Sequence, residues 1–582
     1  MAGFVLHKKK TAAFTGSRTG ERRRLTSLVL PGFAAVAVYS NTLGHGFVYD
    51  DINGILQNPL VAGFSGLSDL PSFLSQPWRP VLFLSYALSH SLFGFDAWVF
   101  HLSNVLIHAV NAVLVCAIAR EAARLWLTED KAEKFALAAG LIFALHPLHS
   151  EAVAYLWGRS SSLCGMFYFG SLLAAMIACR KTVTLERVFW SAGALMAGFL
   201  AWKTKEEALT LPLAIAGFLF LRGHRRAATG ILMTPLLIVL LRYADIARVL
   251  TEAGENRSLV LAGAPPTLKA GSYLLTHFAY NVFYYYAKFV LPVGLNADPT
   301  VKPVTTIADV RLILAALCMT GLAVLGIASM RRHRIISFGL VVLLLSPLAA
   351  YSFMPLADVV AEHRAYIAGL GYALVLAAAV VWKPRYSGAA MLIVSMLFGS
   401  TTVLRNRVWA DSLSLWADTE KKSPTLARPH LNLGVAYHEE GRLEEALVEF
   451  DHALAVNPEL TPALVNRGAI FFQRGELDRA ETELKRAIQI APARAVPYLN
   501  LAFIQLARRR PEAALPWLDR SIALEETAFS RFTRGETLLQ LGRDDEAARE
   551  YLRAAGLPGT LPELATRIGQ RLNQLRQRGV IR

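Results

Sequence analysis

The chain has 582 residues, of which 54% are hydrophobic, and a formal net charge of +16. Such an apolar composition is uncommon in soluble proteins and typical of proteins with several membrane helices. Many lysines and arginines lie in short clusters between apolar runs, where basic residues orient membrane helices, so the charge does not indicate a nucleic-acid partner. The four cysteines have no CxxC spacing and therefore indicate no disulfide framework.

The apolar part of the chain covers residues 25–404 and follows a basic tail at 1–24, which we predict to be cytoplasmic. If the apolar segments alternate across the membrane, the basic clusters between them share one side, and the positive-inside rule makes that side cytoplasmic. This interpretation gives two external loops, at 45–96 and 243–308. The tyrosine-rich segment 271–291 is predicted to lie in the membrane interface. Eleven membrane helices are predicted, near residues 25–44, 97–119, 135–154, 162–179, 187–202, 208–221, 227–241, 309–329, 335–352, 365–382 and 387–404.

Asp50 and Asp51 stand side by side just after the first predicted membrane helix. Charged groups at a membrane edge are costly, and they are usually functional. A carboxylate in this place can act as a general base. The alternative is a turn or a helix cap, which the sequence DDING also suits, although a cap needs only one such residue.

Two histidines three residues apart, His146 and His149, precede Glu151 in the motif HPLHSEAV. Both face one side of a helix end, where Pro147 bends the chain. The motif suits a metal half-site, a phosphate-binding pair or a kinked helix with satisfied polar groups, and a metal is not favoured because no partner cluster is apparent. On the second predicted span, interhelical hydrogen bonding is favoured over a metal site for a polar stripe formed by His101, Asn104, His108 and Asn111.

Basic side chains lie at several external membrane edges. Lys203 and Lys205, followed by Glu206, stand at the entrance of one helix as either a solvated charge run or part of a site. A single cation at such an edge can anchor a helix to lipid headgroups. Several cations that converge beside a carboxylate pair suit an anionic lipid-phosphate substrate instead. The other candidates are Arg79, Arg159 and Arg364.

The C-terminal part is charged and repeats itself with a period near 34 residues, as tetratricopeptide repeats (TPRs) do. We predict a connector helix within 405–426 and about four repeats over 427–582, with a capping helix at 562–578. Small residues at fixed positions let the paired helices approach, and large ones fill the space between repeats. The array indicates a groove for a peptide or protein partner and shows no catalytic constellation.

An acidic pair in the first external loop of a many-span protein is typical of the GT-C superfamily of polyprenyl-phosphate-dependent glycosyltransferases. The chain is more closely similar to the transmembrane-and-TPR O-mannosyltransferase family. The resemblance implies an all-α fold, in which a polytopic GT-C-like bundle precedes a TPR solenoid. The similar stretches follow one another over nearly the whole chain: FVYDDINGILQNPLV, WRPVLFLSYALSHSLFGFDAWVFHLSNVLIHAVNAVL, LIFALHPLHSEAVAYLWGRSSSL, KTKEEALTLPL and AEHRAYIAGLGY, then the repeats.

The resemblance implies that Asp50 and Asp51 are the catalytic acidic pair, and we favour Asp50 as the base and Asp51 as the residue that orients the loop or the acceptor. At Ala368 and Gly369 the sequence departs from the Pro-Ser of many relatives, so the entry to that helix is expected to differ. Residues expected to line the cavity or to bind the phosphate and sugar of the donor are Arg79, His146, His149, Glu151, Arg159, Lys203, Lys205, Glu206, Glu362 and Arg364.

These features predict an inverting membrane glycosyltransferase that moves mannose or another hexose from a polyprenyl phosphate to a Ser or Thr hydroxyl of a protein bound near the TPR array. Transfer is expected on the external face, which is periplasmic in a bacterium or luminal in the endoplasmic reticulum. We expect no cofactor, and a divalent metal is not favoured, because basic side chains can hold the monophosphate leaving group.

Two other functions fit parts of the sequence. An O-antigen ligase or polymerase-like enzyme relies on a large late external loop, for which 243–308 is a candidate. A non-enzymatic membrane-tethered TPR scaffold for envelope assembly requires one membrane span rather than many spans with polar edges, and this ranks it third.

Overall fold

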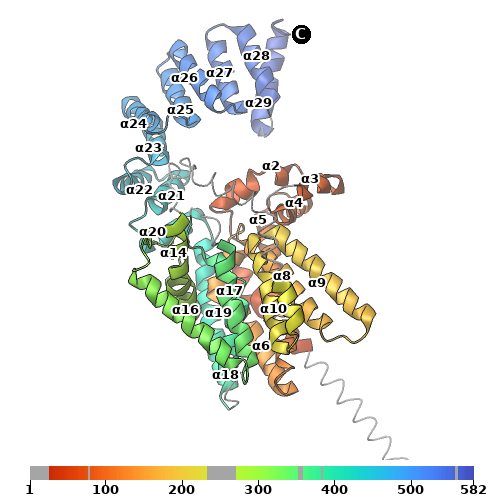
Figure 1. The fold of residues 1–582 in the computed structure, drawn as a ribbon. Coiled ribbons are helices and arrows are strands. Elements are labelled where there is room, and N and C mark those ends of the chain that lie inside the picture. The colour runs from red at the N-terminus through yellow and green to blue at the C-terminus, as the bar shows by residue number, and fades with distance from the viewer. Residues whose placement is uncertain are drawn as a thin grey trace, which may run out of the picture. The chain divides into compact units, whose positions relative to one another are not determined.

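The structure is a computed structural model in which every regular element of the described residues is helical (Figure 1). The described chain divides into two compact units, with the boundary between Lys422 and Ser423. The predicted all-α fold is confirmed for this part of the chain. The described residues are 25–75, 79–232, 270–351, 358–381, 385–557 and 562–581.

Among the described residues of the first unit, five helices are long and apolar enough to cross a membrane. A sixth span results if α6 (Glu129–Leu145) is joined to Pro147–Val153, which follows it at an angle of 49°. Pro147 explains the bend, because proline removes a backbone donor and clashes with the preceding turn. The five helices are Leu25–Thr42, α5 (Ala97–Ala123), α8 (Arg159–Ala178), α16 (Val310–Ser329) and Ser387–Trp409, which contains α19 (Ser387–Asn406).

The predicted count of eleven spans is not confirmed. α10 (Leu211–Arg222) and α18 (Ala368–Val381) have only 12 and 14 residues, fewer than a bilayer crossing requires. α9 (Thr184–Thr204) is long enough, but charged residues near its ends lower its mean hydropathy. α17 (Arg334–Tyr351) covers the span predicted near 335–352, and its part Arg334–Leu345 is one of the shorter apolar helices. The span predicted near 227–241 lies mostly outside the described residues.

Polar side chains of α5 join several helices of this unit. Asn104 donates to the carbonyl of Val153 at 3.1 Å, and Asn111 donates to that of Ser162 at 2.8 Å. His108 bonds to the Tyr366 hydroxyl at 2.6 Å. The interpretation of the α5 stripe as interhelical hydrogen bonding is therefore confirmed for these residues.

The tyrosine-rich segment forms α14 (Ala270–Tyr280), a π-helical turn (Asn281–Tyr286) and α15 (Ala287–Val290). Its predicted position in the membrane interface stays a prediction, and three central tyrosines are buried in the protein. Protein acceptors replace lipid headgroups as partners of their hydroxyls. Tyr284 donates to Glu362, Tyr285 to the carbonyl of Ala361, and Tyr286 to that of Leu343.

The second unit is a succession of antiparallel helix pairs, drawn in blue in Figure 1. Within a pair, small residues allow close approach, since a Cβ on Gly434 would lie 2.6 Å from the ring of Phe450. Gly441 and Gly475 have positive φ at the turns of the first two pairs, where glycine costs least. The pairs are α21 (Ala427–Glu439) with α22 (Leu443–Val456), α23 (Thr461–Gln473) with α24 (Leu477–Ile490), α25 (Ala495–Ala507) with α26 (Pro511–Leu524), and α27 (Ala528–Gln540) with α28 (Asp544–Ala555), followed by α29 (Pro562–Gln577).

Candidate active site

Asp51 is a fully buried carboxyl group that fastens the first loop to a distant segment. Its Oδ2 accepts the backbone N–H of Val48 at 3.0 Å, and its Oδ1 accepts that of Trp157 at 2.7 Å. Burial raises the pKa of Asp51 to about 8, against the opposing effect of these backbone donors. Gly54 permits the same close approach, because a Cβ there would lie 2.3 Å from the Trp157 ring. Asp51 therefore positions the loop.

Asp50 has different surroundings, although it is the neighbouring residue. It is partly exposed, and its Oδ2 accepts the hydroxyl of Tyr155 at 2.9 Å. The Tyr155 ring stacks on Trp409 at 5.0 Å and on Tyr49 at 6.0 Å. Tyr49 has φ of 55°, an uncommon conformation for a residue other than glycine. Asp50 thus presents a partly exposed carboxyl beside an aromatic wall.

A second group of carboxylates lies between the HPLHSEAV and AEHRAY motifs. Glu151 Oε2 accepts the backbone N–H of Glu362 at 2.7 Å, and its Oε1 accepts Nδ1 of His363 at 2.7 Å. Glu362 Oε1 accepts the Tyr284 hydroxyl at 2.8 Å and the Asn296 N–H at 2.6 Å. Burial raises the pKa of Glu362 and lowers that of His363. The structure therefore brings the two predicted glutamates together.

Arg405 binds this carboxylate group from the end of α19. Its Nη2 lies 3.4 Å from Glu362 Oε2, and its Nη1 lies 3.0 Å from Asp418 Oδ2. Its guanidinium also lies 5.7 Å from the ring centre of Trp409, the residue that stacks on Tyr155. Sequence reasoning missed Arg405 because it stands at the composition boundary. The signal that was available is a basic residue four positions before a tryptophan, at the end of the last span.

The KTKEE motif is a buried ion-pair cluster rather than a solvated charge run. Lys205 Nζ lies 2.9 Å from Glu207 Oε1 and donates to Ser161 Oγ at 2.7 Å. Arg79 Nη2 lies 2.8 Å from Glu206 Oε1. Burial lowers the pKa of Lys205. Burial alone would raise the pKa of Glu206, but the charges of Arg79 and Lys205 outweigh it and the net pKa is lowered.

Other predicted donor-binding residues bond mainly to the protein itself. Arg159 is buried and donates to Asn104 Oδ1 at 2.6 Å and to the carbonyl of Phe100 at 2.9 Å. Arg364 Nη1 donates to the carbonyl of Asp358 at 2.8 Å. Lys203 lies over the Trp202 ring at 5.1 Å, outside the KTKEE ion pairs described above. A role for these three in donor binding stays a prediction.

The two histidines of HPLHSEAV hold backbone groups near the helix bend. His146 bonds through Nε2 to the carbonyl of Phe289 at 3.0 Å and accepts the N–H of Leu148 on Nδ1 at 3.2 Å. His149 Nδ1 donates to the carbonyl of Phe143 at 3.0 Å. A Cβ on Gly369 would lie 2.4 Å from His149 Nε2. The position at which this chain differs from the Pro-Ser of many relatives is therefore one where the helix entry closely approaches His149.

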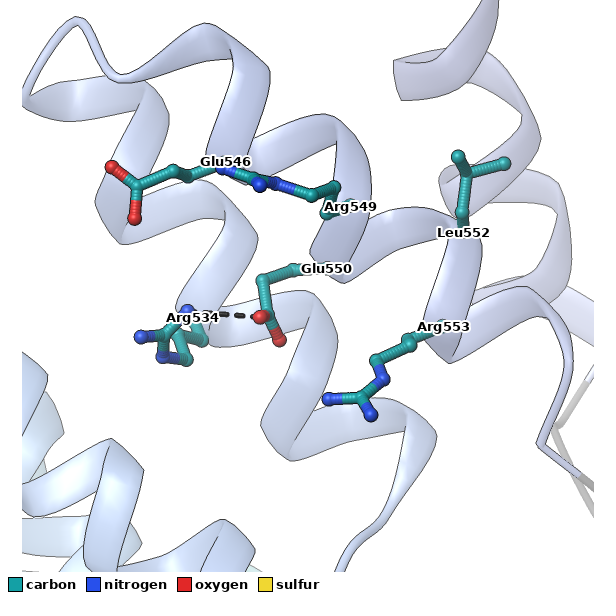
Figure 2. Close-up of a pocket in the computed structure, with 6 residues that line it drawn as sticks. All are labelled: Arg534, Glu546, Arg549, Glu550, Leu552 and Arg553. Atoms are coloured by element: carbon teal, nitrogen blue, oxygen red, sulfur yellow. Dashed lines mark hydrogen bonds and ion pairs between the residues drawn. The ribbon is translucent and has the colours of Figure 1, made fainter.

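In the second unit, a hollow of about 630 Å³ lies on α27 and α28. Figure 2 shows the Arg534 guanidinium directed at the Glu550 carboxylate, and Nη1 lies 2.9 Å from Oε1. Side chains of both charge signs line the hollow. The residues that line it are Arg534, Glu546, Arg549, Glu550, Leu552 and Arg553.

Comparison with known families identifies the repeats. The tetratricopeptide repeat family matches residues 427–452 and 461–494. Among solved structures, a thermophilic TPR protein of Thermus thermophilus matches with 23% identity and a TM-score of 0.25, over 31% of this chain and 94% of that chain.

Curated relatives match much more of the chain. A Caenorhabditis elegans protein O-mannosyl-transferase is 24% identical over 78% of this chain and 66% of its own length. A human protein O-mannosyl-transferase is 28% identical over 73% of this chain and 66% of its own length. One from Drosophila melanogaster is 37% identical over 32% of this chain and 21% of its own length. The matches thus span at most about two thirds of these relatives, and they confirm that the chain resembles the transmembrane-and-TPR O-mannosyltransferase family.

Proposed function

We propose that the protein is an inverting, GT-C-type membrane glycosyltransferase. It transfers mannose or another hexose from a polyprenyl phosphate to a Ser or Thr hydroxyl of an acceptor protein. The observation that carries this proposal is the difference in surroundings between two adjacent carboxyl groups. Asp51 is buried and bound by backbone N–H groups, whereas Asp50 is partly exposed beside Tyr155. The similarity to protein O-mannosyl-transferases supports the reaction class.

Asp50 acts as the general base. It takes the proton of the acceptor hydroxyl while the hydroxyl oxygen bonds to the anomeric carbon. The bond between that carbon and the phosphate oxygen breaks, and its electron pair leaves with the phosphate. Attack opposite the leaving group inverts the configuration. The Tyr155 hydroxyl donates to the carboxylate and orients it toward the acceptor.

The lipid-linked donor binds in the apolar part of the first unit. A hollow of about 500 Å³ lies among α8, α9 and α10, and carbon-rich side chains line most of it. Its lining includes Trp202 and Ala208, which flank Lys205 in the sequence. An isoprenoid chain suits the apolar lining, and the nearby cations in the sequence, Lys203 and Lys205, suit a phosphate. The hollow holds the lipid tail, and Arg79 and Lys205, each of which is paired with a glutamate, hold the phosphate headgroup.

The TPR array binds the acceptor protein and performs no chemistry. TPR helices form grooves for protein segments. The hollow on α27 and α28 carries arginines and glutamates, which suits a polar peptide segment. The array and the acidic pair lie on the external side of the membrane in this proposal, so that acceptor and donor meet on one face.

The test is complementation of a deletion strain, with mass spectrometry of hexose-modified envelope proteins. Wild-type protein restores the modified peptides, whereas Asp50→Asn at equal expression does not. Asp96→Asn is the matched control, because this carboxylate before α5 is exposed and accepts a local bond from Trp98. Equal modification with wild-type and Asp50→Asn protein contradicts the general-base role. Unchanged modification after deletion contradicts the transferase itself and favours the scaffold alternative.

A further inference from the structure

The first helix pair of the TPR unit contains a cluster that the transferase mechanism does not use. His430 lies on α21, and Glu449 and His452 lie on α22. One ligand atom from each residue lies within 4.8 Å of the other two, and no other such trio occurs in the described part of the chain. His430 is buried, Glu449 is partly buried and His452 is exposed. The cluster therefore has a fixed inner side and a solvent-facing outer side.

The hydrogen bonds of His430 define which ring nitrogen faces the cluster. Nε2 lies 3.0 Å from the carbonyl of Pro424, so Nε2 carries a proton and donates it. Nδ1 then points at Glu449 Oε2 at 2.7 Å. A lone pair and a carboxylate oxygen cannot approach this closely unless a proton or a metal cation lies between them. In a metal-binding histidine, the ring nitrogen that does not bind the metal usually donates its hydrogen to a carbonyl or carboxylate, as Nε2 of His430 does here.

His452 completes a possible coordination sphere. Its Nδ1 lies 3.8 Å from the same Glu449 oxygen, and its ring centre lies 5.3 Å from that of His430. Ligand atoms about 2.0–2.1 Å from a tetrahedral zinc ion lie about 3.3 Å apart. The observed separations of 2.7 and 3.8 Å bracket that value, and the exposed His452 side chain is free to adjust.

We propose that His430 Nδ1, Glu449 Oε2 and His452 Nδ1 bind a divalent transition-metal ion, with zinc as the chemical type. Two imidazoles and one carboxylate form an established zinc ligand set that leaves a further position for water. The ion replaces the proton between His430 and Glu449, and this proton passes to solvent. The site ties α21 to α22 at the start of the array and takes no part in sugar transfer.

The experiment uses the tag-free, full-length protein in detergent after treatment with a chelator. Zinc is titrated by calorimetry, and cobalt is added separately because its absorption reports the coordination geometry. We expect saturable binding of one ion per chain. Glu449→Gln and His452→Ala should each weaken it by about 100-fold, since loss of a direct ligand costs at least as much as loss of an outer partner. His438→Ala, on α21 beside Gln473 of the next pair, is the matched control and should bind like wild type.

X-ray absorption at the zinc edge is measured on the wild-type complex, so its result does not depend on whether a variant folds. Scattering from two imidazoles and one or more oxygen ligands supports the site. Absence of imidazole ligands overturns the proposal, as does equal zinc affinity in wild type, Glu449→Gln and His452→Ala. Absence of one-to-one binding in the wild type also overturns it and leaves a proton-bridged pair of His430 and Glu449.

Discussion

Tyr155 donates its hydroxyl to Asp50 at 2.9 Å across 105 positions of sequence. Two residues further on, Trp157 donates its backbone N–H to Asp51 at 2.7 Å. One short segment before α8 therefore holds both carboxyls of the acidic pair, the first through a side chain and the second through the backbone. The two carboxyls therefore have different surroundings, and we assign them different roles.

Asp50→Asn should lower the rate of sugar transfer about 10²–10⁴-fold, because the amide cannot accept the acceptor's proton. Tyr155→Phe should cost about tenfold, since it removes one hydrogen bond to a charged group and keeps the ring that stacks on Trp409. The measurement is initial rate with purified protein and a polyprenyl-phosphate hexose. A larger loss in Tyr155→Phe than in Asp50→Asn would show that the tyrosine, not Asp50, does the chemistry.

Asp51→Asn should act on stability and on loop position. The amide NH₂ must face the N–H of either Val48 or Trp157, so one buried donor loses its acceptor. Such a loss costs about 1–3 kcal/mol. The thermal unfolding midpoint should fall, and proteolysis of the first loop should become faster. An unchanged midpoint together with wild-type cleavage would contradict the positioning role.

The same variant should change the pH dependence of stability. The pKa of Asp51 is about 8 in the folded protein and near 3.8 when exposed, so the folded state holds the proton more tightly between these values. The contribution of Asp51 to stability is therefore complete below pH 4 and declines as the pH rises toward 8. Unfolding midpoints at pH 5.5 and 8.0 should differ more in wild type than in Asp51→Asn. Identical slopes would exclude a raised pKa.

Arg405→Gln should destabilise the first unit strongly. It removes the cation between Glu362 and Asp418, and Glu362 is fully buried. Loss of one partner of a buried ion pair typically costs about 3–5 kcal/mol. Arg407→Gln is the control, because Arg407 is exposed two residues further on. Thermal unfolding in detergent measures both variants, and equal midpoints would show that the network is not structural.

Arg509→Gly should stabilise the third helix pair of the TPR unit. Arg509 has φ of 58° at the turn where Gly475 stands in the preceding pair with φ of 77°. A left-handed conformation costs a residue other than glycine about 1 kcal/mol. Gly475→Ala is the reverse control and should destabilise the second pair. Hydrogen exchange of α25 and α26 measures the effect locally, and faster exchange in Arg509→Gly would contradict it.

The proposed topology places Ser65 and Glu459 outside and Arg332 inside the cytoplasm. All three side chains are exposed, so a cysteine at each site can react. In a background without native cysteines, an impermeant maleimide should label Ser65→Cys and Glu459→Cys in intact cells. Arg332→Cys should react only after permeabilisation. Protection of Glu459→Cys in intact cells would separate the TPR array from the acidic pair.

The sequence by itself determined the features that depend on local pattern. The 34-residue period predicted the TPR helices, because each repeat forms a helix pair from neighbouring residues and its small positions, such as Gly434, recur at fixed spacing. The acidic pair was recognisable because two carboxylates after an apolar run are rare. The interhelical role of Asn104 and His108 followed from helical spacing alone.

Only the tertiary structure decided which role each residue of the acidic pair takes. Asp50 and Asp51 are identical in type and adjacent in sequence, and their difference in burial comes from Tyr155 and Trp157, more than one hundred residues away. Arg405 was missed although a tryptophan stands four positions after it, because its partner Glu362 precedes it by 43 positions. Hydropathy likewise failed to fix the number of spans, because it measures the apolar character of a segment and contains no information on the neighbours that shield a short or charged helix.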